Sequence, residues 1–198
     1  MTNSQKAIIN EIELFAKTKN VPIIQKDAAS VLCEVCARRK PQSILEIGTA
    51  IGYSGALMLL NSAPDSRLTT IDISEPAIKQ AVQNFDSLKL TSRVEIVMGD
   101  CIEVLKGLKD SYDFVFLDGP KALYIECLPL ILKLCSKGSV IVADNMNYGK
   151  REHADMAEDR KRRVVGKLTE FINAVKDNPM LEDEFLDIGD GIALINVL

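Results

Sequence analysis

The sequence predicts a doubly wound α/β domain built on a Rossmann-like, mostly parallel sheet of seven strands. From Pro41 onward, short apolar runs alternate with helical segments, and the runs are apolar throughout rather than at every second position. Uniformly apolar strands suit a parallel sheet covered on both faces, and the helices between them supply its crossover connections. The last two apolar runs flank Gly-Asp-Gly, which predicts a C-terminal antiparallel hairpin.

The elements follow in order along the chain. Two amphipathic helices are expected first, at residues 3–18 and 25–39, separated by Val21-Pro22. Five parallel strands are expected at residues 43–47, 67–72, 93–98, 112–118 and 139–144. Helices between them are expected at residues 53–61, 75–88, 101–108 and 121–134. A polar segment then leads into a helix that ends near Val175, and the hairpin strands are expected at residues 184–188 and 192–197.

Length and composition indicate one ordinary soluble domain. The 198 residues suffice for a single domain, residues 1–198, in which we expect residues 1–40 to cover the site. A net charge of −4 and a pI near 5.2 give no global basic field for nucleic acid. No apolar run approaches the roughly 18 residues of a membrane span. The charged N-terminus does not read as a signal peptide, and five scattered cysteines favour a reducing cytoplasm.

Cys33 and Cys36 form a C-x-x-C motif inside the second expected helix. A zinc site needs four ligands, and the single histidine, His153, is far away in the sequence. A redox motif would open a helix after a strand instead. Both thiols are therefore expected to be buried core residues.

An acidic residue stands within two residues of the C-terminal end of every expected parallel strand. In open α/β sheets, ligands bind beyond these ends, so the acids indicate the position of the site. They are Glu46, Asp72, Asp100, Asp118 and Asp144, the last of which is followed by Asn145.

The loop after the first strand contains Gly48 and Gly52. Its glycines follow the spacing G-x-x-x-G-x-x-G, which does not match a dinucleotide-binding loop, and Glu46 would repel a pyrophosphate. A nicotinamide-dependent oxidoreductase is therefore disfavoured. Glu46 instead suits a cationic ligand, and Asp72 suits the two hydroxyls of a ribose, a pair that indicates S-adenosylmethionine.

Six motifs in order resemble the cation-dependent class I O-methyltransferases, the family of catechol and caffeoyl-CoA O-methyltransferases. They are SILEIGTAIGYSGALML, TIDIS, VMGDC, YDFVFLDGPKALY, VIVADN and FLDIGDGIALI. The resemblance runs from about residue 20 to the C-terminus. NVPIIQKDAASVL is most like Firmicute-type bacterial members, some of which methylate 5-hydroxyuridine in tRNA. The resemblance also implies a homodimer.

The resemblance assigns a donor side to the site. Glu46 and Gly48 would line the methionine portion of S-adenosylmethionine, and Ser54 would bind its carboxylate end. Asp72 would hold the ribose. Asp100 and the backbone of Cys101 would lie near the adenine, Cys101 standing where relatives often carry alanine.

The resemblance also assigns a metal site to Asp118, Asp144 and Asn145. Three hard oxygen ligands suit Mg²⁺, or Mn²⁺ or Ca²⁺, better than zinc. Lys121 would be the general base beside Asp118. The alternative for Asp118 or Asn145 is helix capping.

The acceptor stays open between a catechol-like small molecule and 5-hydroxyuridine in tRNA. Basic residues after the fifth strand suit a phosphate backbone, but acidic residues among them suit a solvated helix face. The basic residues are Lys150, Arg151, Arg160, Lys161, Arg162 and Arg163, and the acidic ones are Glu152, Asp155, Glu158 and Asp159. A catalytically silent module that binds S-adenosylmethionine or RNA is the alternative to an enzyme. The Asp118, Lys121, Asp144 and Asn145 set disfavours it.

Overall fold

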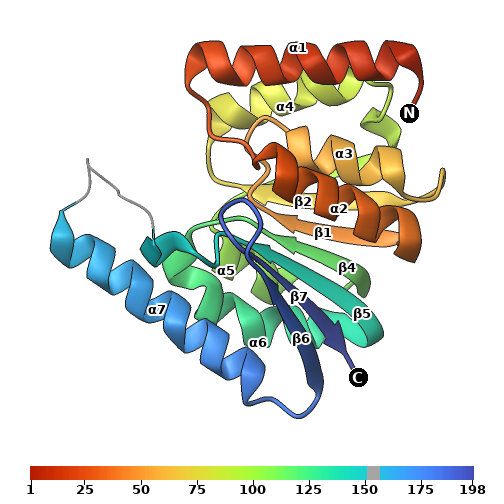
Figure 1. The fold of residues 1–198 in the computed structure, drawn as a ribbon. Helices are drawn as coiled ribbons and strands as arrows, with labels where there is room; N and C mark the ends of the chain where they lie inside the picture. The colour runs from red at the N-terminus through yellow and green to blue at the C-terminus, as the bar shows by residue number, and fades with distance from the viewer. Residues whose placement is uncertain (151–156) are drawn as a thin grey trace.

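A computed structural model describes residues 1–150 and 157–198. Its centre is a seven-stranded sheet with the strand order β3-β2-β1-β4-β5-β7-β6 and helices on both faces (Figure 1). β1 to β5 run parallel, whereas β7 pairs antiparallel with both β5 and β6. The predicted fold class, including the C-terminal antiparallel hairpin, is confirmed.

The strands begin and end close to the expected positions, except at β5 and β6. Their bounds are β1 Ser43–Ile47, β2 Arg67–Asp72, β3 Val94–Met98, β4 Tyr112–Leu117, β5 Cys135–Asp144, β6 Leu181–Leu186 and β7 Ile192–Val197. β5 starts at Cys135 rather than residue 139, where three polar or glycine residues hide the strand start. β6 starts at Leu181 rather than residue 184 because an edge strand tolerates exposed acidic side chains.

The helices match their expected ranges, with one division. Their bounds are α1 Asn3–Lys19, α2 Lys26–Arg39, α3 Tyr53–Asn61, α4 Glu75–Ser87, α5 Cys101–Gly107, α6 Tyr124–Leu134 and α7 Glu158–Lys176. Short 3₁₀ turns lie at η1 Thr91–Arg93, η2 Lys121–Leu123 and η3 Tyr148–Lys150. The helix expected at residues 121–134 therefore begins as the η2 turn and becomes α-helical at Tyr124.

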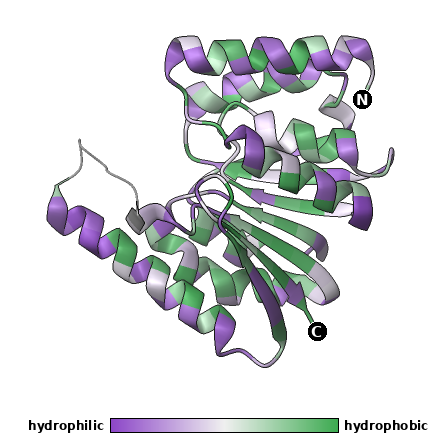
Figure 2. Cartoon of the chain, viewed as in Figure 1, coloured by the Kyte–Doolittle hydropathy of each residue, from purple (hydrophilic) through white to green (hydrophobic). Residues whose placement is uncertain are grey.

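Two hydrophobic cores lie on opposite faces of the sheet. Alternate residues of β4 serve each core, with Phe114 and Phe116 on the α1–α4 side and Val115 and Leu117 on the α5–α7 side. All four are fully buried. Figure 2 shows the resulting pattern, with apolar strands at the centre and helices such as α7 that alternate polar and apolar faces. No helix in the described part of the chain combines the length and apolarity that a membrane span requires.

Candidate functional site

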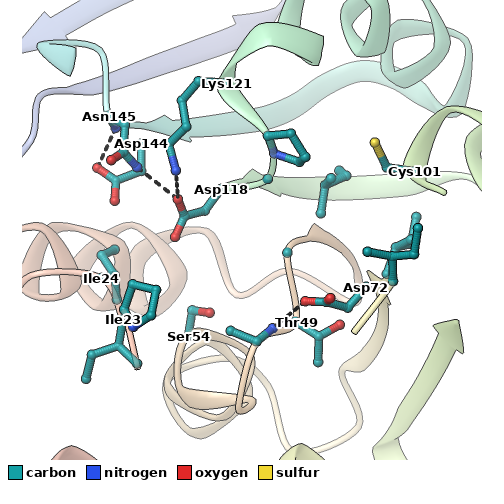
Figure 3. Close-up of a pocket in the computed structure, with 18 of the residues that line it drawn as sticks. Ile23, Ile24, Thr49, Ser54, Asp72, Cys101, Asp118, Lys121, Asp144 and Asn145 are labelled. Carbon is teal, nitrogen blue, oxygen red and sulfur yellow. Dashed lines mark hydrogen bonds and ion pairs between the residues drawn. The ribbon is translucent and has the colours of Figure 1, made fainter. Parts of the chain in front are cut away.

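A cavity of about 310 Å³ opens at the carboxyl edge of the parallel strands, where the sequence places its acidic residues (Figure 3). The loops after β1 to β5 form most of its wall, and residues 22–25 and the loop between β6 and β7 close the rest. Figure 3 shows Asp118, Lys121, Asp144 and Asn145 on one side, and Asp72 and Cys101 on the other. This volume falls within the range of small-molecule sites.

The loop after β1 passes very close to the end of β4. Gly48 adopts a φ of +107°, and a Cβ atom there would lie 2.5 Å from the carbonyl oxygen of Asp118. The backbone N–H groups of Gly48 and Thr49 both donate to the carbonyl oxygen of Ile71, at the end of β2. Glycine is thus required at residue 48 both by conformation and by space.

The Asp72 carboxylate fixes this loop from the second strand. Its Oδ2 accepts from the Ala50 N–H at 2.8 Å, and its Oδ1 accepts from the Ser74 N–H at 2.8 Å. Asp100 caps α5, because its Oδ1 accepts from the N–H groups of Ile102 and Glu103. Both carboxylates line the cavity, where their contacts with ribose and adenine stay predictions.

Glu46 lies beneath the cavity rather than in its wall. Its side chain is fully buried and accepts hydrogen bonds from the Ser54 hydroxyl at 2.5 Å and the Thr70 hydroxyl at 2.6 Å. Burial raises the pKa of the Glu46 carboxyl to about 7; the two hydroxyl donors oppose this rise, and Asp118 and Asp72 add to it. Ser54 lines the cavity, and since its one proton is donated to Glu46, it faces a ligand as an acceptor.

Asp118, Lys121, Asp144 and Asn145 converge at the ends of β4 and β5. Lys121 Nζ lies 3.3 Å from Asp118 Oδ1, which also accepts from Asn145 Nδ2 at 2.9 Å. Asp144 Oδ1 accepts from the Asn145 backbone N–H at 2.7 Å. Asn145 has a φ of +69°, a left-handed conformation that asparagine tolerates better than most residues.

The Asp118 carboxylate is poorly compensated. Burial raises its pKa, and Lys121 and Asn145 oppose that rise only in part. Asp144 is also buried. Among the described residues, this corner brings the carboxylates of Asp118 and the buried Asp144 together beside Lys121, and gathered carboxylate oxygens are ligands that a hard cation prefers.

Tyr124 supports this corner from below, a role that was not predicted. Its buried hydroxyl lies 3.0 Å from the carbonyl oxygen of Leu117 and 3.3 Å from that of Asp144, so it joins the ends of β4 and β5. The tyrosine at the end of the YDFVFLDGPKALY motif was the signal that could have indicated it.

A family model for O-methyltransferases matches residues 4–198, nearly the whole described chain. The chain belongs to the O-methyltransferase family. Tapetum-specific methyltransferase 1 of Arabidopsis thaliana is 28% identical over 88% of this chain and 76% of its own length. Catechol O-methyltransferase of Niastella koreensis is 33% identical, over 59% of this chain and 53% of its own length.

A solved structure shows the same fold. The O-methyltransferase of Bacillus cereus, crystallised in complex with SAH, superposes with a TM-score of 0.85 at 23% identity, over 97% of this chain and 91% of that one. The prediction of a class I S-adenosylmethionine-dependent O-methyltransferase is confirmed at the level of the family and the enzyme class. Metal dependence, the acceptor and membership of the tRNA-modifying subclass stay predictions.

Four of the basic residues considered for RNA binding lie apart from the cavity of this O-methyltransferase. Arg160 to Arg163 are in the first half of α7, and no α7 residue lines the cavity. Arg151, Glu152, His153 and Asp155 lie outside the described residues. Cys33 and Cys36 are on α2, with Cys36 fully buried, and both are free thiols.

Proposed function

We propose that this O-methyltransferase transfers the methyl group of S-adenosylmethionine to one of two adjacent hydroxyls of a small, catechol-like acceptor. A divalent cation, Mg²⁺ first and Mn²⁺ or Ca²⁺ next, would be held by Asp118, Asp144 and Asn145. The observation that carries the proposal is the gathering of these three side chains and Lys121 on the wall opposite Asp72. Family membership supports the donor.

The residues present fit a hard cation. Two desolvated carboxylates and one amide offer oxygen ligands, and waters or acceptor oxygens would complete the shell. Among residues 1–150 and 157–198, no cluster of three or more acidic, histidine or cysteine side chains could hold a metal. The proposed set contains only two acids, so it suits a cation that shares its coordination with the acceptor. Asn145 Nδ2 donates to Asp118 Oδ1, so ligation would require the Asn145 amide to rotate and turn its oxygen toward the cation.

When bound, the cation would make the acceptor hydroxyl more acidic by stabilising its oxyanion. The residues of the chain do the rest. Lys121, held beside Asp118, is positioned to take the proton of a hydroxyl seated there. Ser54 would accept from the donor ammonium rather than bind the carboxylate end, because its proton is donated to Glu46. Asp72 would hold the ribose, so that the methyl group faces the acceptor oxygen.

The cavity wall favours a small acceptor over RNA. Among the described residues that line it, five are aspartates and one is a lysine, a balance that repels a phosphate backbone. The aspartates are Asp72, Asp100, Asp118, Asp144 and Asp190. Pro22, Ile23 and Ile24 add an apolar wall to the cavity, and Ile23 and Ile24 lie near the metal corner (Figure 3), which suits an aromatic ring.

Two variants test the metal. Asp118→Ala and Asp144→Ala should lose methyl transfer to a catechol by at least about a hundredfold while S-adenosylhomocysteine still binds. Asp86→Ala, which removes an exposed acid from α4, should keep full activity. Full turnover of the two site variants, or of the wild type in excess EDTA, would contradict metal dependence.

The acceptor is tested with a catechol panel and with tRNA lacking the uridine modification, with and without Mg²⁺. We expect turnover of a catechol with a nearly flat response to added salt. Turnover of tRNA alone, falling steeply with salt, would instead assign the enzyme to RNA. Donor binding without methylation of either acceptor would support the silent module.

A further inference from the structure

The apolar wall of the cavity has a second hollow behind it. This outer hollow, of about 580 Å³, is lined by residues of α1, by the segment between α1 and α2, and by the first residues of α2 and α3. Four residues line both the cavity and the outer hollow, and together they form a partition between the two. They are Pro22, Ile23, Ile24 and Tyr53. The partition therefore borders a hollow on each of its two sides.

The backbone of the partition is held by few hydrogen bonds. Residues 22–24 belong to the segment that connects α1 to α2 without regular secondary structure. Pro22 has no N–H group, and the hydrogen bonds among the described residues include none from the backbone of Ile23 or Ile24. Ile24 is buried in the core, whereas Ile23 is only partly buried against it. The position of the partition therefore depends on side-chain contacts.

Glu13, in α1, supports the partition from the outer hollow. Its Oε1 accepts from the Tyr53 hydroxyl at 2.7 Å, and its Oε2 lies 2.7 Å from Lys26 Nζ. Lys26 is the first residue of α2 and Tyr53 is the first residue of α3, so this one carboxylate joins the starts of two helices to α1. Glu13 and Lys26 line the outer hollow but not the cavity. Glu13 can therefore act on a ligand in the cavity only through its partners.

The bond to Tyr53 is the stronger of the two contacts. The Lys26 side chain is 80% exposed, and an ion pair at such exposure contributes little. Tyr53 is 4% exposed and the Glu13 side chain 20%, and a hydrogen bond to a charged, partly buried acceptor contributes more than a neutral one. Burial by itself raises the pKa of the Glu13 carboxyl, but Lys26 and Tyr53 outweigh it and hold that pKa below its usual value. Glu13 is therefore charged at neutral pH and fixes the Tyr53 hydroxyl.

We propose that Glu13 is a positioning residue that sets the size of the acceptor. By fixing Tyr53, it keeps the partition from receding into the outer hollow, which offers space where a packed core would offer none. The cavity then favours a catechol without substituents over a catechol that carries a bulky group. This inference rests on the proposed methyl transfer to a catechol-like acceptor, whereas the support of the partition by Glu13 does not.

Steady-state kinetics with catechol and with 4-tert-butylcatechol test the effect on the acceptor. Glu13→Ala should raise KM for catechol about threefold to tenfold with less than about a twofold change in kcat, because the wall moves while the reacting groups stay in place. The preference for catechol over 4-tert-butylcatechol, as a ratio of kcat/KM values, should fall by about threefold or more. The Kd of S-adenosylhomocysteine should stay within about twofold of that of the wild type.

Four further variants separate positioning from general damage. Tyr53→Phe, which removes only the hydroxyl, should reproduce the fall in preference, and Lys26→Ala should have a smaller effect. Glu13→Gln should keep most of the preference, because its amide oxygen can still accept from Tyr53. The matched control is Glu11→Ala, which removes an exposed acid of the same helix that lines neither hollow. It should behave as the wild type.

Hydrogen exchange of the ligand-free protein, followed by mass spectrometry, tests the support of the partition without any turnover. Residues 20–29, which contain the connecting segment and the first turn of α2, should exchange severalfold faster in Glu13→Ala than in the wild type or in Glu11→Ala. Faster exchange in Glu13→Ala, combined with a wild type that methylates neither catechol, would remove the proposed acceptor and leave Glu13 as the support of the partition.

Three results would overturn the role of Glu13. The first is an unchanged preference between the two catechols in Glu13→Ala. The second is an equal loss of kcat/KM for both catechols in Glu13→Ala that Glu13→Gln does not restore, which would mean that Glu13 serves the fold alone. The third is a larger effect of Lys26→Ala than of Tyr53→Phe, which would assign the effect to the exposed ion pair instead of the bond to Tyr53.

Discussion

Glu46 shows how burial changes the chemistry expected of a strand-end acid. The sequence places it beside the methionine portion of the donor, but its carboxyl is enclosed by Ser54 and Thr70 and does not line the cavity. Sequence spacing identifies the strand end, whereas the side chains that Glu46 meets depend on the register of β1 against β2. In that register Glu46 pairs with Thr70, which makes the hydrogen bond possible.

Glu46 should make the stability of the protein fall as pH rises toward neutrality. Its pKa is raised from 4.5 to about 7 in the folded state, so the folded protein binds its proton more tightly than the unfolded chain does. The resulting stabilisation is complete below pH 4.5 and is lost as pH rises to about 7, by up to roughly 3 kcal/mol. Urea unfolding of the wild type and of Glu46→Gln at pH 5 and pH 8 measures it. The stability difference between the two proteins should change with pH, and a constant difference would contradict a raised pKa.

Lys121 should act on turnover rather than on donor binding. It lies beside Asp118 at the metal corner and is absent from the donor side of the cavity. Lys121→Ala should lower kcat by about a hundredfold to ten-thousandfold, the usual contribution of a general base. Titration with S-adenosylhomocysteine should give an unchanged Kd. A variant that loses donor affinity but keeps kcat would contradict the role of a base.

Among the elements, the strand ends were the most predictable feature. Each expected parallel strand ends within one residue of its observed end, because each apolar run stops at a glycine or an acidic residue. The order of the strands in the sheet was harder to predict from the sequence. The Gly-Asp-Gly turn predicts a hairpin, but only long-range pairing places β7 between β5 and β6, with Asp144 opposite Ile192. Local sequence carries no record of that pairing.

Because local sequence does not give long-range pairing, the contribution of the β6–β7 hairpin to the site was not predicted. Gln25 stands at the N-cap position of α2 without making a side-chain cap, and its Nε2 donates instead to Asp190 Oδ2 at 3.1 Å. Both residues line the cavity. The hydrogen bond therefore joins the segment before α2 to the loop between β6 and β7 along the cavity wall. A residue that breaks a local rule in this way suggests a functional constraint.

Removing this hydrogen bond should loosen the acceptor side of the cavity. Gln25→Ala should raise KM for a catechol about threefold to tenfold, since a small displacement of a wall residue weakens positioning. Unfolding stability should change little because the bond is exposed. The matched control is Arg39→Ala, which removes an exposed bond from the other end of α2 to Asn196 of β7. Equal acceptor KM values for the two variants would assign Gln25 a purely structural role.

At the scale of the whole molecule, the site concentrates negative charge beyond the modest excess of the chain. The net charge is −4, yet the described residues that line the cavity include five aspartates against one lysine. Such a field favours cations inside a partly desolvated cleft. S-adenosylmethionine carries one positive charge more than S-adenosylhomocysteine, its product. The protein should therefore discriminate between substrate and product by charge.

That discrimination should weaken with salt. The Debye length falls to about 3 Å at 1 M salt, so charges farther apart than this are largely screened. Raising the salt concentration should therefore reduce the preference for S-adenosylmethionine over S-adenosylhomocysteine by about threefold to tenfold. Calorimetric titration of both ligands, in EDTA to keep divalent cations away, measures the ratio of the two Kd values at each salt concentration. Asp100→Asn removes one cavity charge and should shift that ratio at low salt, whereas Asp86→Asn, on the exposed side of α4, should not. The two ligands differ only in the methyl group on sulfur and the positive charge that it brings. Equal salt dependence for both would therefore mean that the aspartates act only through hydrogen bonds and not through their summed field.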